Sequence, residues 1–158
     1  MVAARAVGVS PRELERYLHE HIPLSRAMGV SVAALSPDEV RLAAPLAPNI
    51  NHRDTVFGGS AAALAMLAAW SLLHVRLAAQ GHAARLVIQR NTMEYERPIP
   101  GDFIARATLA EPQRWAQFAT LLARRGKARI AVAAVLEHAG QVAGRLRGEF
   151  VALAGPDG

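Results

Sequence analysis

Residues 51–70 constrain the fold of this chain more than any other segment. Five consecutive polar side chains beginning at Asn51 precede the glycine pair Gly58-Gly59, and an almost purely apolar run continues to Trp70. A helix that is apolar on all sides is buried in a core rather than half exposed. Glycines at its start let a ligand carbonyl or phosphate approach the backbone N–H groups. The segment therefore predicts a buried helix whose N-terminus binds a small electrophilic group.

Length and composition predict one globular domain. The chain has 158 residues, enough to bury the core of one domain over residues 1–158. Its composition, 52% hydrophobic and 20% charged, argues against disorder. Residues 1–10 and 155–158 are expected to be loose ends. His74 and Arg76 interrupt the longest apolar run, so we expect no transmembrane span and no membrane partner. The lack of cysteine excludes disulfides and thiolate metal sites, and it fits a cytoplasmic protein.

The net charge of +5 comes almost entirely from arginine, since Lys127 is the only lysine. The basic residues are spread along the chain without basic–aromatic interleaving or zinc-finger spacing, so we expect no nucleic-acid partner. One local cluster, Arg124, Arg125, Lys127 and Arg129, has two interpretations. It could bind the phosphates of an anionic carrier such as coenzyme A. Alternatively, it is a solvated basic face, as most such runs are.

Helix signals occur at three places. Ser10, followed by Pro11 and Glu13, is a helix-start signal, and the helix it begins is expected to end near Pro23. The long apolar helix is expected over residues 59–80, before a glycine that suits its C-terminal cap. A second short helix should open after residues 111–112, where apolar residues recur at helical spacing.

Strand signals fill most of the remaining chain. They predict strands over residues 29–35, 39–46, 84–95, 102–109, 128–138 and 141–153, with a tight turn at 139–140. One long buried helix among five or six largely antiparallel strands is an α+β layout in which a curved sheet wraps the helix. Such a sheet leaves an open edge or face, which dimerisation commonly covers.

Two motifs carry a resemblance to a known family. The segment Asn51…Phe57-Gly58-Gly59-Ser60 resembles the Asn…His-Gly-Gly signature of the hot-dog fold thioesterases, and residues 93–98 are similar to the strand end after their central helix. The order of elements matches theirs over residues 12–153. More narrowly, Asn-His-x-x-Thr-Val-Phe-Gly-Gly-Ser resembles a thioesterase domain also found as the C-terminal half of some bacterial acetyltransferase fusions.

The resemblance implies a fold, a substrate class and an assembly. The fold is the hot-dog fold, an antiparallel sheet wrapped around a long central helix. The expected substrate is an acyl thioester of coenzyme A (acyl-CoA) or of an acyl carrier protein (acyl-ACP), with no cofactor and no metal. A homodimer or a dimer of dimers is the expected assembly.

The resemblance also implies a site at the start of the central helix. In the relatives, an Asn at the position of Asn51 lies near the thioester, and an N–H group, here that of Gly59, polarises its carbonyl. An Asp or Glu one to two turns into their helix acts as nucleophile or general base, but Met66 occupies that place here, and Phe57 replaces the usual His. The expected substrate-binding residues are Phe57, Gly58, Ser60, Met66, Asn91 and Thr92.

A base for water must therefore come from elsewhere. His52 is the nearest substitute, because imidazole is a natural general base near neutral pH, and Asp54 is placed to orient it. Asn91 or Thr92 could contribute across a dimer interface. Each residue also has a structural interpretation: Asn51, His52 and Asp54 could form a turn or a helix N-cap, and Met66 a core or groove wall.

Three functions are compatible with these features. The first is hydrolysis of an acyl thioester by water activated at the N-terminus of the central helix. The second is a non-catalytic module that binds acyl thioesters, motivated by Met66 in place of the helix carboxylate. The third function, which these features support least, is that of a dehydratase on the same fold, because dehydration requires a dedicated acid–base pair.

Overall fold

The computed structural model describes residues 8–155. The elements in chain order are α1 (Pro11–His21), α2 (Pro23–Ala27), β1 (Ser31–Leu35), β2 (Val40–Ala44), the 3₁₀ turn η1 (Ala47–Asn49), α3 (Gly58–Ala79), β3 (Ala84–Tyr95), β4 (Phe103–Leu109), the 3₁₀ turn η2 (Pro112–Arg114), α4 (Trp115–Arg125), β5 (Lys127–His138) and β6 (Gln141–Ala154). The predicted strands are all present, and no strand end differs from its predicted position by more than two residues. The separate helix α2 was not predicted.

Within residues 8–155 the strands form one six-stranded antiparallel sheet in the order β1-β2-β4-β5-β6-β3. The strands β5 and β6 form a long hairpin, and its turn residues Ala139 and Gly140 both have positive φ. The short strand β1 and the twelve-residue strand β3 are the two edges. The α+β class and the antiparallel sheet are therefore confirmed.

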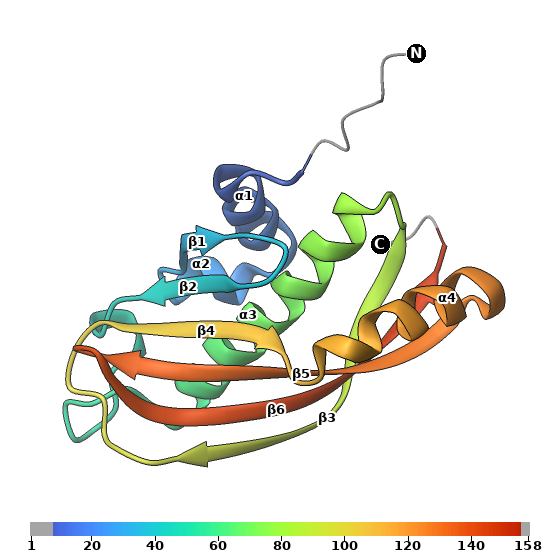
Figure 1. The fold of residues 1–158 in the computed structure, drawn as a ribbon. Coiled ribbons are helices and arrows are strands. Elements are labelled where there is room, and N and C mark those ends of the chain that lie inside the picture. The colour runs from blue at the N-terminus through green and yellow to red at the C-terminus, as the bar shows by residue number, and fades with distance from the viewer. Residues whose placement is uncertain (1–7, 156–158) are drawn as a thin grey trace.

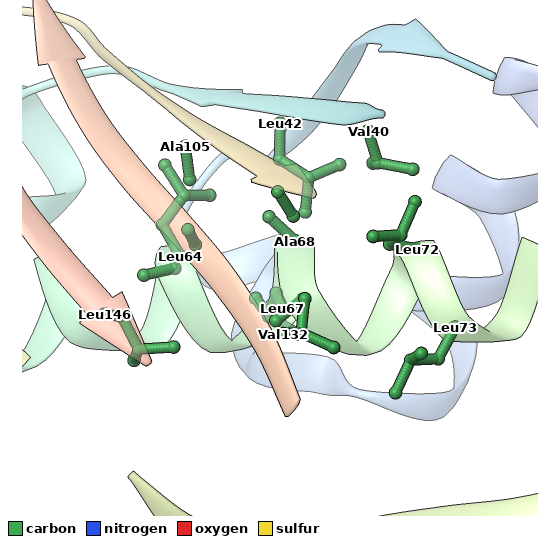
Figure 2. Packing of buried hydrophobic residues seen from close by; sticks show 14 of the residues in the cluster. Val40, Leu42, Leu64, Leu67, Ala68, Leu72, Leu73, Ala105, Val132 and Leu146 are labelled. Atoms are coloured by element: carbon green, nitrogen blue, oxygen red, sulfur yellow. The ribbon is translucent and has the colours of Figure 1, made fainter. Parts of the chain in front are cut away.

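The curved sheet wraps the long helix α3, as Figure 1 shows. Leu64, Ala68 and Leu72 of α3 are completely buried and lie beside Leu42 of β2 and Ala105 of β4 (Figure 2). By length and composition α3 could cross a membrane, yet 67% of its most apolar window is buried inside the protein. The apolar character of α3 is thus used to build the core.

The sheet leaves one side of α3 incompletely covered. Residues at helical spacing along this side are half-buried or exposed, while the residues between them are mostly buried. We name this side the open stripe; it consists of Gly59, Ala63, Met66, Trp70 and His74. Because it begins in the first turn of α3, a ligand at the helix N-terminus can extend along the stripe.

The helix α1 begins with the predicted capping box. The Ser10 hydroxyl accepts from the Glu13 N–H at 3.1 Å, and the Ser10 N–H donates to the Glu13 carboxylate at 3.2 Å. Ser10 is therefore ordered, although it belongs to the predicted loose end 1–10. Of the two predicted loose ends, residues 1–7 and 156–158 lie outside the described part of the chain.

Candidate functional site

The first turn of α3 presents backbone N–H groups that the helix itself does not use. Phe57 occupies the N-cap position, and no side chain of the described residues caps the helix. The first N–H in the helical ladder is that of Ala61, which donates to the Phe57 carbonyl at 3.0 Å. The N–H groups of Gly58, Gly59 and Ser60 precede the ladder and lie at the positive end of the helix dipole. This turn can therefore bind an anionic or polarised oxygen.

The loop before α3 is organised around the side chain of Asn51. Its Oδ1 accepts from the N–H groups of Arg53 at 2.8 Å and Thr55 at 3.2 Å. Its Nδ2 donates to the Thr55 hydroxyl at 3.0 Å, and the Asn51 backbone N–H donates to the Thr55 carbonyl at 2.8 Å. The amide that the resemblance assigns to the thioester is thus occupied in shaping the loop in this conformation.

His52 and Asp54 project from the same loop into solvent. Both side chains are exposed, and in the described residues no hydrogen bond links His52 to Asp54. The backbone of Asp54 has a φ of 62°, a left-handed conformation that Asp tolerates in tight turns. The alternative interpretation of Asp54 as the N-cap of α3 is wrong, since Phe57 occupies that position.

The two glycines at the start of α3 have different surroundings. A Cβ on Gly58 would stand 3.5 Å from the Tyr95 ring, an ordinary contact, whereas a Cβ on Gly59 would overlap the ring of Phe57. Phe57 itself is 58% exposed. The absence of a side chain at Gly59 thus accommodates the Phe57 ring, which packs over the first turn of the helix.

Met66 lines a groove beside the open stripe. This groove, here the apolar groove, has a volume of about 330 Å³ and lies next to β3 and α2. Its walls are Ile22, Leu24, Ala63, Met66, Leu67, Trp70, Ile88 and Phe150. All these side chains are hydrophobic, so the groove suits an alkyl or aryl group.

A second groove of about 390 Å³ adjoins the start of α3, and we call it the helix-start groove. Tyr95, Glu96 and Gly58 are among its lining residues. The Tyr95 hydroxyl donates to the Gly58 carbonyl at 3.1 Å, which ties the end of β3 to the first turn of α3. Glu96 accepts from Arg145 Nε at 3.2 Å. The fold therefore brings Glu96 to the edge of the groove that adjoins the helix N-terminus, with its carboxylate paired to Arg145, a residue outside that groove.

The predicted pair on β3 is divided between the two faces of the sheet. Asn91 pairs with Gly148 and Thr92 with Arg147, so the two side chains point to opposite faces. The next pair on the face of Asn91 joins Met93 to the buried Leu146, which belongs to the core around α3. Asn91 therefore shares the face of α3, and Thr92 lies on the outer face.

Asn49 is a site-supporting residue that the sequence did not reveal. Its buried side-chain Nδ2 donates to the backbone carbonyls of Met28 at 2.9 Å and Pro45 at 2.8 Å, and its backbone carbonyl accepts from the Phe57 N–H at 2.7 Å. It thus anchors both ends of the loop that leads into α3. Asn in a Pro-Asn dipeptide is a common turn signal, which gave no reason to expect a buried amide.

Comparison with known proteins identifies the family. The family described as "Putative thioesterase (yiiD_Cterm)" matches residues 11–154, nearly the whole chain. The chain belongs to this thioesterase family. The hot-dog fold implied by the sequence motifs is confirmed with it.

Solved structures share the fold over almost their full length. A Chlorobaculum tepidum protein of unknown function, OLEI01261, has a TM-score of 0.85 at 27% identity, covering 94% of this chain and 99% of that one. A putative thioesterase from Shewanella oneidensis has a TM-score of 0.81 at 23% identity, with 90% and 96% covered. The probable thioesterase PA5026 from Pseudomonas aeruginosa has a TM-score of 0.75 at 26% identity, with 92% and 97% covered.

Two further features of this thioesterase-family chain concern charge. Arg124, Arg125, Lys127 and Arg129 are all exposed around the left-handed Gly126 that ends α4. Of these, Arg129 lines a hollow of about 350 Å³ together with Arg90, Arg114 and Arg147. Hydrogen bonds from Arg147 and Arg114 lower the pKa of Glu111 in the same hollow.

In the described residues, no three His, Asp or Glu side chains lie in an arrangement that would hold a metal.

Proposed function

We propose that this protein hydrolyses an acyl thioester whose carbonyl oxygen binds at the first turn of α3. One observation carries the proposal. The unused N–H groups of Gly58, Gly59 and Ser60 stand at the head of the open stripe, and an apolar groove lies along that stripe. A polar anchor followed by an apolar channel is complementary to a thioester carbonyl followed by an acyl chain. Membership of the thioesterase family supports the same chemistry.

The N–H groups would stabilise the oxyanion that forms when water attacks the carbonyl. Preorganised donors of this kind contribute about 3 kcal/mol each to transition-state stabilisation when they are well aimed. The positive end of the helix dipole adds to the effect. The donors come from the backbone, so no side chain is needed for this part of the reaction.

Glu96 is our first candidate for the group that activates water. It lines the helix-start groove with Gly58, and a carboxylate is the group that relatives carry on their central helix. Its ion pair with Arg145 at 3.2 Å holds the carboxylate at the end of β3. A carboxylate within hydrogen-bond reach of a water beside the carbonyl can accept its proton. His52, exposed on the loop before α3, is the second candidate, with Asp54 to orient it.

A homodimer completes this proposal. The edge strand β3 leaves Val87 51% exposed on the outer face of the sheet and Tyr95 59% exposed on the face of α3. A long, partly apolar edge strand invites pairing with a second copy. Such pairing would cover the stripe and bring Asn91, on the face of α3, toward the groove of the partner.

Non-catalytic binding of acyl thioesters is the competing function. Met66 favours it, because a thioether stands on the open stripe where relatives have a carboxylate. In that case the apolar groove would hold the acyl chain without turnover.

Free-thiol release from acyl-CoAs of increasing chain length, with an aryl-CoA included, tests the proposal. Glu96→Gln and His52→Ala are compared with the controls Glu94→Gln and His82→Ala, which remove the same groups away from the helix start. We expect turnover by wild type, a loss of ten-fold or more in Glu96→Gln, and little change in either control. A matching loss in His52→Ala alone would assign the base to His52. Saturable binding without thiol release by wild type would establish the binding module instead.

A further inference from the structure

Trp70 separates two grooves that run along the open stripe. On one side is the apolar groove of about 330 Å³; on the other is a groove of about 460 Å³ at the far end of α3, here the polar-ended groove. Trp70 is the only described residue that lines both. Its side chain is therefore the wall between them.

Several contacts hold the Trp70 ring in this place. The indole N–H donates to the Leu86 carbonyl on β3 at 3.2 Å. The ring stacks on His74 with centroids 4.8 Å apart and on Tyr17 at 5.7 Å, with an angle of 14° between the planes in both cases. Tyr17 and His74 also stack on each other at 4.9 Å. The wall thus connects α1, α3 and β3, and the rings of Tyr17 and His74 brace it from the side of the polar-ended groove.

The two grooves differ in chemistry. The apolar groove is lined by hydrophobic side chains, including Met66, Ile88 and Phe150. The polar-ended groove contains Tyr17, His74, His82 and Arg85, together with apolar residues such as Leu77, Leu86 and Val87. An alkyl chain could therefore pack against apolar surface in either groove. The ring of Trp70 closes the passage from the first groove into the second.

We propose that Trp70 sets the upper limit of acyl-chain length by closing the apolar groove; this inference rests on the proposed function. From Gly59 to Trp70 the helix advances eleven residues, or about 16 Å. A staggered chain with C–C bonds of about 1.5 Å advances roughly 1.25 Å per bond, so this span holds on the order of a dozen carbons. Trp70 acts as a specificity-determining residue and takes no part in the chemistry.

Binding of free saturated fatty acids tests the proposal without requiring catalysis. Displacement of a fluorescent fatty-acid probe gives the dissociation constant for each chain length. In wild type, affinity should rise about four-fold per added methylene and then stop rising at a limiting length. In Trp70→Ala the rise should continue beyond that limit by several carbons, because the two grooves become one.

Matched variants keep the test decisive. Met66→Ala widens the apolar groove and leaves its end closed, so its limiting length should equal that of wild type. Trp70→Leu removes the ring but keeps an apolar side chain, and it replaces Trp70→Ala if circular dichroism shows that the alanine variant is unfolded. The proposal is overturned if the limiting chain length of the folded Trp70 variant equals that of wild type. It is also overturned if Met66→Ala shifts the limiting chain length as much as the Trp70 variant does.

The same variants separate this inference from the proposed function. If wild type releases thiol, the chain-length profile of kcat/KM should shift in Trp70→Ala as the binding profile does. A second outcome is that wild type releases no thiol but binds fatty acids up to a limiting length, and that this length increases in Trp70→Ala. In that case the hydrolase proposal fails and the role of Trp70 stands. If thiol is released while the limit stays fixed, only the role of Trp70 fails.

Discussion

The ring of Phe57 occupies the space that a side chain on Gly59 would need. Phe57 is also the N-cap residue of α3, so a single residue begins the helix and covers its first turn. The glycine pair is therefore asymmetric: only the second glycine is required by a neighbouring side chain. This relationship can be measured as a coupling free energy.

Gly59→Ala should lower the free energy of unfolding by at most about 1 kcal/mol, because the added methyl must displace the exposed Phe57 ring while alanine favours the helix more than glycine does. Gly58→Ala should leave stability unchanged or slightly raised, since its Cβ stands 3.5 Å from the Tyr95 ring. In a Phe57→Ala background, Gly59→Ala should cost nothing. Urea denaturation of the four variants in the Phe57–Gly59 cycle measures this. Equal costs of Gly59→Ala in both backgrounds would show that the ring is not the cause.

Ser71→Ala should leave stability unchanged or raise it by up to about 1 kcal/mol. The Ser71 hydroxyl is fully buried in α3 and has no hydrogen-bond partner among the described residues, so its removal relieves an unsatisfied polar group. Ser25→Ala is the matched control. Its equally buried hydroxyl donates to the Ile22 carbonyl at 2.8 Å, and its loss should cost about 1 kcal/mol. Urea denaturation measures the free energy of unfolding of both variants. A larger loss of stability in Ser71→Ala than in Ser25→Ala would show that the Ser71 hydroxyl is not an unsatisfied polar group.

His74 should make the fold acid-sensitive. Burial lowers the pKa of His74 below the usual histidine value, so in the unfolded chain this residue binds a proton at a higher pH than in the folded protein. Stability is therefore complete above the usual histidine pKa and declines as pH falls from there toward the folded-state pKa. His74→Phe keeps a ring in the stack with Tyr17 and Trp70 and should remove this part of the decline. Thermal unfolding from pH 7.5 down to 5 tests it, and superimposable profiles of the two proteins would contradict it.

Val87→Lys should weaken the proposed dimer by ten-fold or more. Val87 is a large exposed apolar residue on the edge strand β3, and lysine on an edge strand opposes pairing with another strand. Ala34→Lys places the same charge on the other edge strand, β1, and should leave assembly unchanged. Sedimentation velocity over a range of protein concentrations measures the association. Wild type that remains monomeric throughout would rule out this mode of assembly.

The fold was predictable because its largest signals are local. The all-apolar run of α3 and the alternating strands identified the layout, and the capping box at Ser10 fixed the start of α1. The helix α2 was missed because Pro23 follows the end of α1 and also begins the next helix. A proline after a helix usually signals only its end.

The site was less predictable because long-range register decides it. A bulge between Ile88 and Arg90 reverses the alternation along β3. Without that bulge, Thr92 would face α3 and Asn91 would face outward. Glu96 lies near the start of α3 because β3 pairs with β6 and its neighbour Tyr95 hydrogen-bonds to Gly58 across 37 positions of sequence. Neither the bulge in β3 nor the hydrogen bond between Tyr95 and Gly58 can be predicted from the spacing of residues in the sequence.

The open stripe places the proposed anchor for a carbonyl and the proposed wall of the acyl groove on one helix, α3. Their separation is fixed by the rise of about 1.5 Å per residue and does not depend on loop conformation. A single-residue insertion between Gly59 and Trp70 would rotate everything beyond it by about 100° and carry Trp70 off the stripe. On the proposed roles, a substitution in this segment would change the length of chain that the groove holds, whereas an insertion or deletion would separate the wall from the groove.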